Sequence, residues 1–335
     1  MSLFREHPSP KYRDGQQPVI ENHQRVVSAM NVREWALPVY TILMQTAMGS
    51  LFFLWLIRIR ESRRLDPYGK DRLLQIPLTI ILVTIFFAMV GAHFHLSKPF
   101  LSLLAVSNFR TSWLSREIVF TILFFSLTFA IWLLHRLRPS AGRLIDIVGW
   151  GAILCGWAMI YCMARIYLLP TQISWNSPTT ILHYIGTTFL LGSSALLAIL
   201  WMDQRFVSVR NPQSAEQTLT RRPEALTLLA VVVLAAAILD ISIELYQIAA
   251  LRAGIGPART SLELLFGLYQ PLLFMRIGLV LIGASWLAYN TLQLKRLQNR
   301  SHDQLLPVYA SFMLLMIGEI LGRFLFYATH VRIGL

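Results

Sequence analysis

Residues 306–328, LPVYASFMLLMIGEILGRFLFYA, decide the fold class of this chain. At about 1.5 Å per residue in a helix, an apolar run of this length crosses the ~30 Å hydrocarbon core of a bilayer. Its two charged residues, Glu319 and Arg323, stand four positions apart and therefore share one helix face. The stretch predicts a transmembrane helix with one polar face.

Seven similar runs precede it, at 36–58, 73–94, 116–136, 147–169, 179–201, 224–246 and 271–293. Of all 335 residues, 55% are hydrophobic and 14% charged, whereas soluble domains carry about 25% charged residues. We therefore expect an all-α fold, a polytopic integral membrane bundle of eight transmembrane helices at 35–335. An extramembrane tail at 1–34 precedes it.

The lysines and arginines predict the orientation of the bundle. Sixteen of them lie in the alternate connections 58–72, 136–143, 205–222 and 295–300, against five in the opposite connections. The positive-inside rule places the richer set in the cytoplasm. We expect a multi-pass protein of the bacterial inner membrane with both termini outside. The net charge of +13 is explained by these loops, and because no recognition motif accompanies it, we expect no nucleic-acid partner.

Ionisable residues within the spans indicate where function lies, because charge in a bilayer is costly. By the predicted topology they all fall in the outer half of the bundle: Glu117, Arg165, Asp240, Glu244, Arg276, Glu319 and Arg323. The inner halves are expected to be almost purely apolar. We expect a Glu319–Arg323 pair, and we expect Arg276 and Arg165 to compensate the like charges of Asp240 and Glu244. We therefore expect one polar site near the outer face of the membrane.

Cysteine and histidine decide which cofactors are expected. The two cysteines form no Cys-x-x-Cys motif, so we expect no iron–sulfur cluster in this chain. A transmembrane haem needs two histidines on different spans at matching depth, which leaves His93 or His95 with His183. A haem b anchor therefore stays an alternative, as does a purely structural anchor. We expect no metal site.

The chemistry that these ionisable residues favour is proton transfer. A histidine beside carboxylates and arginines at one membrane face suits quinol oxidation, in which protons leave the hydroxyls as electrons pass to an acceptor. We expect the donor to be menaquinol or ubiquinol. Without a cluster of its own, the chain requires an acceptor on another subunit docked at the outer face. We expect no activity from the chain alone.

Several short motifs carry a family resemblance. They are residues 33–38 (REWALP), 95–99 (HLSKP), 114–118 (LSREI), 165–167 (RIY) and 318–323 (GEILGR), followed by Phe326, Tyr327 and His330. In this order and spacing, the chain from about residue 33 onward resembles the membrane anchor subunit of the dimethyl sulfoxide reductase family of molybdenum enzymes.

The resemblance implies an eight-helix anchor that oxidises quinol without haem. Its partners would be a four-cluster iron–sulfur subunit and a molybdopterin catalytic subunit. By the motif matches, His95 is the residue most tied to quinol oxidation, with Glu117 in its vicinity. The residues expected to bind quinol or to lie just behind that site are Trp35, Arg165, Tyr167, Glu244, Arg276, Glu319, Arg323 and Tyr327.

Overall fold

The computed structural model describes residues 32–61, 67–95, 106–210, 223–293 and 305–331. The long helices are α2 (Val32–Glu61), α3 (Pro67–His95), α5 (Trp113–Leu137), α6 (Gly142–Ile166), α7 (Pro178–Arg210), α9 (Pro223–Ala253), α11 (Gln270–Gln293) and α12 (Leu305–Ala328). Two short elements, η2 (Val106–Asn108) and α10 (Pro257–Phe266), accompany them. Within the described ranges, eight helices are long and apolar enough to cross a membrane. The predicted all-α bundle is confirmed.

Local sequence explains where these helices begin. Proline, with its fixed φ and no amide hydrogen, suits the first turn of a helix. The helices that start on a proline are α3, α7, α9 and α10. In front of α5, the Ser112 hydroxyl accepts a hydrogen bond from the Ser115 amide at 3.3 Å, which caps a helix end that would otherwise leave this donor unpaired.

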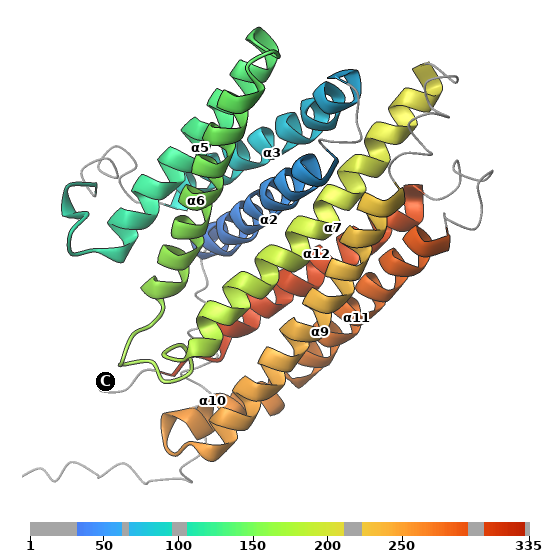
Figure 1. The fold of residues 1–335 in the computed structure, drawn as a ribbon. Helices are drawn as coiled ribbons and strands as arrows, with labels where there is room; N and C mark the ends of the chain where they lie inside the picture. Colours follow the sequence, from blue (N-terminus) through green and yellow to red (C-terminus); the bar gives the residue numbers. More distant parts are fainter. Residues whose placement is uncertain (1–31, 62–66, 96–105, 211–222, 294–304, 332–335) are drawn as a thin grey trace, which may run out of the picture.

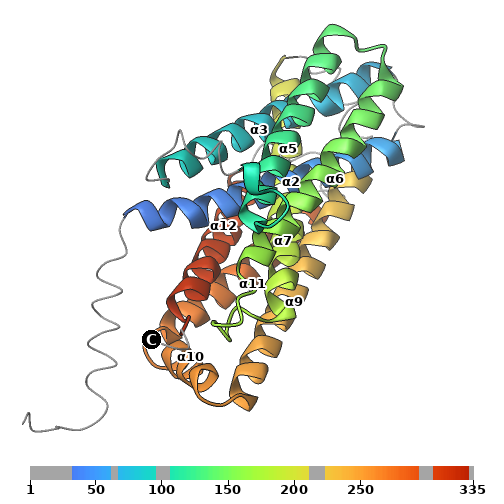
Figure 2. The ribbon, with the colours of Figure 1, turned by 90° about the vertical axis from the view of Figure 1, so that its left-hand side faces the viewer.

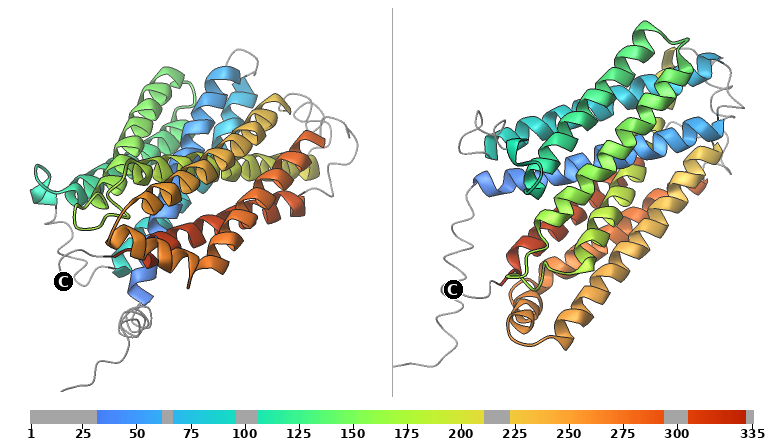
Figure 3. Two further views of the ribbon diagram at one scale, coloured as in Figure 1. Left: turned by 90° about the horizontal axis from the view of Figure 1, so that it is seen from below. Right: turned by 60° about the vertical axis from the view of Figure 1, so that its left-hand side comes forward.

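The long helices form two four-helix bundles. Helices α2, α3, α5 and α6 pack in chain order, and α6 returns to α2; helices α7, α9, α11 and α12 repeat this arrangement, and α12 returns to α7. Figure 1 shows the two groups side by side, blue to green and yellow to red, and Figure 3 shows the same separation from two other directions. We call them the N-terminal bundle and the C-terminal bundle.

The bundles meet where α2 packs against α7. A Cβ added at Gly49 would lie 2.0 Å from the Thr188 carbonyl oxygen, and one added at Gly192 would lie 2.3 Å from the Gly49 Cα. The two backbones are therefore in direct contact, as small residues allow in membrane helices. The Ser50 hydroxyl donates to the Gly192 carbonyl at 3.1 Å. Buried residues make up 72% of the span in α2 and 83% in α7, against 28% in α5, so α2 and α7 form the centre.

The outer surface of both bundles is apolar. Large side chains that are more than half exposed include Phe86, Phe87, Ile147, Leu154 and Ile238. Hydrophobic surface of this extent is unfavourable in water and is covered by lipid in a membrane. The chain is a multi-pass membrane protein.

An even number of described spans brings the start of α2 and the end of α12 to one end of the molecule. We call this the termini end; it also carries residues 167–177 and α10, which lies beside the end of α9 (Figures 1 and 2). The sixth span was expected to end at 246, but α9 continues to Ala253 and α10 follows it. Helix α2 begins at Val32, inside the predicted tail; residues 1–31 lie outside the described ranges, so the boundary at residue 34 stays a prediction.

Candidate functional site

Arg276 of α11 is the centre of a buried charge network in the C-terminal bundle. Its guanidinium donates to Glu244 Oε2 and to Asp240 Oδ2 of α9, each at 2.7 Å. One of its nitrogens also lies 3.6 Å from Glu319 Oε1 of α12. Because Arg276, Asp240 and Glu319 are buried, water does not screen these interactions. The expectation that Arg276 compensates Asp240 and Glu244 is confirmed.

Helix α7 adds two further groups to this network. His183 lies between two carboxylates, with Nδ1 at 3.2 Å from Asp240 Oδ1 and Nε2 at 3.6 Å from Glu244 Oε2. The Thr187 hydroxyl donates to Glu319 Oε2 at 2.5 Å. All four helices of the C-terminal bundle therefore contribute polar side chains to one cluster.

Arg323 connects the network to the N-terminal bundle. It donates to the Gln45 side-chain oxygen of α2 at 2.8 Å, and its guanidinium carbon lies 4.0 Å from the centre of the Tyr184 ring. The predicted Glu319–Arg323 salt bridge is absent from these described helices. The spacing does place both residues on one face of α12, but Thr187 and Gln45, on neighbouring helices, take their hydrogen bonds.

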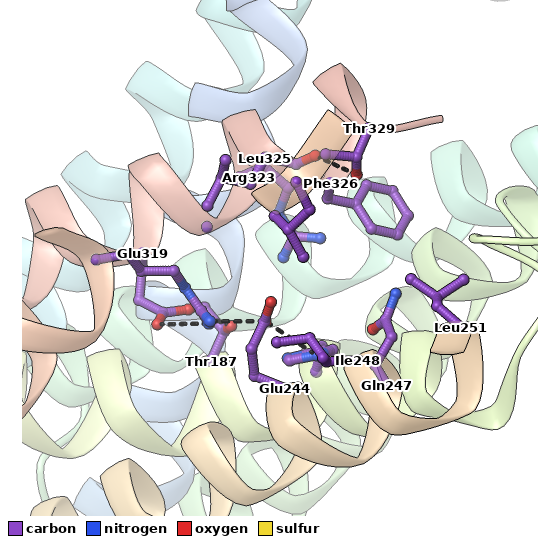
Figure 4. A pocket seen from close by; sticks show the side chains of 14 residues that line it. Thr187, Glu244, Gln247, Ile248, Leu251, Glu319, Arg323, Leu325, Phe326 and Thr329 are labelled. Carbon is purple, nitrogen blue, oxygen red and sulfur yellow. Dashed lines mark hydrogen bonds and ion pairs between the residues drawn. The ribbon is translucent and has the colours of Figure 1, made fainter. Parts of the chain in front are cut away.

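A small cavity opens beside the network (Figure 4). Its volume is about 50 Å³, and its polar lining includes His183, Glu244, Arg276, Glu319 and Arg323. Further lining residues towards the termini end are Gln247, Thr329 and Leu265 of α10. A water molecule needs roughly 10–15 Å³ measured in this way, so the cavity has room for a few waters and is too small for a quinone ring.

Aromatic side chains fill the junction between the bundles at the termini end. The hydroxyls of Tyr167 and Tyr327 lie 2.5 Å apart, and the Tyr167 ring stacks on Tyr184. Trp175 stacks on Phe326, and its indole nitrogen donates to the Phe326 carbonyl at 2.7 Å. Burial raises the pKa of the Tyr167 hydroxyl above its ordinary value, so this hydroxyl stays neutral and able to donate.

The N-terminal bundle holds one buried carboxylate of the predicted set. Glu117 of α5 is 6% exposed and lies close to the Tyr40 hydroxyl of α2. That hydroxyl is also 2.9 Å from the Thr121 hydroxyl. The salt bridges of the described residues do not include Glu117. Its polar neighbours, Tyr40 of α2 and Thr121 one turn further along α5, carry uncharged hydroxyls, in contrast to the Arg276 cation beside Asp240.

The remaining predicted residues fall into two groups. The side chains of Trp35 and His95 lie outside the described residues; His95 is the last residue of α3, at the end of the bundle where α5 begins. Arg165 packs its guanidinium against the Trp113 ring at 4.9 Å, and Arg116 lies 4.2 Å from the same ring. The expectation that Arg165 compensates Asp240 and Glu244 was therefore wrong, because α6 belongs to the other bundle.

The opposite end of the molecule is less apolar than expected. Asp203 of α7 and His135 of α5 are both buried there, and Arg58 donates to Asp146 at 2.8 Å. The prediction that the inner halves are almost purely apolar was wrong, since α7 continues past the apolar run predicted at 179–201 and buries Asp203, and α5 buries His135.

Sequence reasoning also missed several members of the site: Tyr40, Gln45, Thr121, Tyr184 and Thr187. His183 was considered only as a haem ligand. A usable signal existed, because each of these polar groups interrupts an apolar run at the depth of a predicted ionisable residue. The described residues contain no group of three or more histidine, cysteine, aspartate or glutamate side chains arranged to hold a metal ion.

Comparison with known proteins decides the family. The model of the DMSO reductase anchor subunit (DmsC) matches residues 30–329, which is most of the chain. The chain belongs to the DMSO reductase anchor subunit family. This membership identifies it as a membrane anchor of the kind that serves a molybdoenzyme complex, and it confirms the resemblance carried by the short motifs.

Curated relatives of the DmsC family match at low identity, two of them over nearly their full length. The C subunit of the anaerobic dimethyl sulfoxide reductase of Escherichia coli K12 is 24% identical over 305 residues, covering 90% of this chain and 96% of the relative. The anaerobic dimethyl sulfoxide reductase subunit YnfH of the same organism is 22% identical over 306 residues, with the same coverage. The C subunit of the Haemophilus influenzae enzyme is 25% identical over 176 residues, covering 51% of this chain and 61% of that protein.

Proposed function

We propose that this chain is the quinol-oxidising membrane anchor of a respiratory molybdoenzyme complex. Menaquinol or ubiquinol binds at the termini end and gives its electrons to an iron–sulfur subunit docked there. A molybdopterin catalytic subunit then uses these electrons. The termini end faces the outside of the bacterial inner membrane, because the connections at the other end carry most of the lysines and arginines.

The observation that carries the proposal is the buried Glu117 carboxylate at the termini end of the N-terminal bundle. Its neighbours Tyr40 and Thr121 supply hydroxyls and no positive charge. A carboxylate that is buried without a cationic partner is suited to exchange a proton with a substrate hydroxyl. Helix α3 ends at His95 at this same end of the bundle, which supplies a second proton acceptor near neutral pH.

Each residue has a role in this proposal. Oxidation of one quinol releases two electrons to the iron–sulfur subunit and two protons to the protein; His95 accepts one proton, and Glu117 accepts the other. Orienting contacts to the substrate come from Trp35, Arg165, Tyr167, Arg323 and Tyr327. The network of Glu244, Arg276 and Glu319 lies behind the substrate site, since the cavity beside it is too small for the ring.

Two alternatives are less well supported. In the haem b alternative His183 would face an iron, but both of its ring nitrogens face carboxylates. In the structural-anchor alternative the polar residues would only hold helices together. A buried carboxylate outside the salt-bridge network, such as Glu117, contributes little to that role.

The test is quinol-driven turnover by membranes that carry the intact complex with His95→Leu. An artificial electron donor that reduces the iron–sulfur subunit directly is measured in parallel. We expect His95→Leu to abolish quinol-driven turnover and to leave donor-driven turnover unchanged. The control is His302→Leu, between α11 and α12 in the sequence, which should leave both rates unchanged. If both rates survive His95→Leu, the anchor has no redox role. If both rates are lost, Glu117→Gln with the same pair of assays decides between the two functions.

A further inference from the structure

The charge network of the C-terminal bundle lacks one positive charge. It contains three carboxylates, Asp240, Glu244 and Glu319, and two arginines, Arg276 and Arg323. The groups that face it from the neighbouring helices are His183 and Thr187 of α7 and Gln45 of α2. Since uncompensated charge is unfavourable inside a span, neutrality requires one proton to stay within the cluster.

Two groups can hold this proton. A neutral imidazole donates from only one nitrogen, whereas the protonated ring donates from both; His183 has a carboxylate at each nitrogen. The alternative position is Glu319, whose Oε1 is buried and has no hydrogen-bond partner among the described residues. The proton therefore has two places within one cluster.

The cavity joins these two places. His183 and Glu319 both line it, and so does Arg276, whose Nε is a second buried atom with no hydrogen-bond partner in the described helices. Ordered waters commonly satisfy buried polar atoms of this kind. Gln247 and Thr329 continue the polar lining towards the termini end (Figure 4). A short chain of waters therefore fits between Glu319 and the aqueous side.

Three tyrosine side chains, Tyr167, Tyr184 and Tyr327, lie near both Glu117 and Arg323, which lines this cavity. Arg323 lines the cavity and packs on the Tyr184 ring, and the hydroxyls of Tyr167 and Tyr327 lie next to each other. Tyr184 and Tyr327 are also close enough to Glu117 to interact with it electrostatically. Phenolic hydroxyls both donate and accept hydrogen bonds, so the bonded Tyr167 and Tyr327 hydroxyls can pass a proton between them, and the Tyr184 hydroxyl, which is buried without a hydrogen-bond partner among the described residues, is available to extend this pair.

We propose that the cavity of the C-terminal bundle is a proton-release site, distinct from the place where quinol binds. One of the two protons from each quinol passes from Glu117 through the tyrosine hydroxyls to the His183–Glu319 cluster. The proton already held there leaves through the waters beside Gln247 and Thr329. The two electrons go separately to the oxidised iron–sulfur cluster of the partner subunit. This inference rests on the proposed quinol oxidation.

Single-turnover measurements on the intact, detergent-solubilised complex test the two ideas separately. Quinol is mixed with the oxidised complex; reduction of the partner's clusters is followed by absorbance, and proton release by a pH-indicator dye. If quinol does not reduce the clusters of the unaltered complex, the proposed function fails. If it does, the variants below test the release site.

Glu319→Gln keeps the shape of the side chain and removes the titrating group. We expect it to slow proton release by about tenfold or more, as loss of a proton-transfer group does, and to slow cluster reduction much less. Gln247→Leu blocks the water path without changing charge, and we expect a smaller delay in the same direction. Glu263→Gln, on the exposed face of α10, is the matched control.

Proton release at the unaltered rate in Glu319→Gln and in Gln247→Leu would overturn the inference. So would an equal slowing of cluster reduction and proton release, because a purely structural cluster would affect both through the fold. If Glu319→Gln fails to assemble, Gln247→Leu alone decides the outcome.

Discussion

The two bundles place their buried ionisable groups in different ways. In the C-terminal bundle, Asp240 and Glu244 are held directly by Arg276. In the N-terminal bundle, Glu117 is held beside the hydroxyl groups of Tyr40 and Thr121. The same helix order is therefore used once around a network of ion pairs and once around a carboxylate beside neutral hydroxyls.

This difference predicts how each bundle responds to a substitution. A charge that is paired on several sides is expensive to disturb, because removal of one partner leaves the others uncompensated. A carboxylate with hydroxyl neighbours can change its protonation without breaking an ion pair. We therefore expect loss of the Arg276 cation to affect assembly first, and substitutions at Glu117 to affect turnover first.

The largest effect is expected from Arg276→Met. It leaves Asp240 and Glu244 buried without their cation, at a cost of about 3–5 kcal/mol. We expect little assembled complex in the membrane and a strongly lowered thermal midpoint in detergent. Arg259→Met, at an exposed position of α10, is the control. Normal assembly of Arg276→Met would mean that the network is not what stabilises the C-terminal bundle.

Glu117→Gln tests the buried carboxylate of the N-terminal bundle. We expect quinol-driven turnover to fall by about 100-fold, within the range for loss of a proton-transfer group. The thermal midpoint and donor-driven turnover should stay close to those of the unaltered complex. The same substitution at the exposed Glu263 should leave both assays unchanged. A variant that loses stability and keeps quinol turnover would reverse the roles assigned to the two bundles.

Gly49→Ala tests the contact that joins the bundles. The added Cβ would meet the Thr188 carbonyl oxygen at 2.0 Å, so the helices must separate, at a cost of roughly 1–3 kcal/mol. A Cβ at Gly278 meets nothing within 4 Å, and Gly278→Ala should therefore be neutral. Thermal unfolding of the purified complex measures both. Equal midpoints would show that the α2–α7 contact adapts without strain.

The smallest effect on stability is expected from Tyr327→Phe. It removes one hydroxyl of the Tyr167–Tyr327 hydrogen bond, which is worth about 0.5–1.5 kcal/mol. We expect a slightly lowered thermal midpoint, measured beside Tyr246→Phe, a residue of α9 that is 67% exposed. If both substitutions lower the midpoint equally, the hydrogen bond between the bundles adds no stability.

Much of the fold could be predicted from the sequence because hydropathy is a local property. Each apolar run is long enough to span a bilayer by itself, and the ladder of hydrogen bonds within each helix satisfies its backbone. The eight spans follow from this requirement. The depth of Glu244, Arg276, Glu319 and Arg323 follows as well, because it depends only on the distance along a helix from its end.

The partners of these residues could not be predicted in the same way, because they depend on helix rotation and neighbour order. Arg165 and Arg276 were both candidates to compensate Asp240, and the division into two bundles gave that role to Arg276. Glu319 and Arg323 share a face of α12, yet they bond to Thr187 and Gln45 on other helices.

The sequence by itself therefore determined which segments cross the membrane and at what depth the charges of the polar site lie, since both follow from local hydropathy and helical rise. Only the tertiary structure decided that His183 sits between Asp240 and Glu244, and that Glu117 has hydroxyl neighbours. These pairings are set by the packing of helices far apart in the sequence, which no local pattern records.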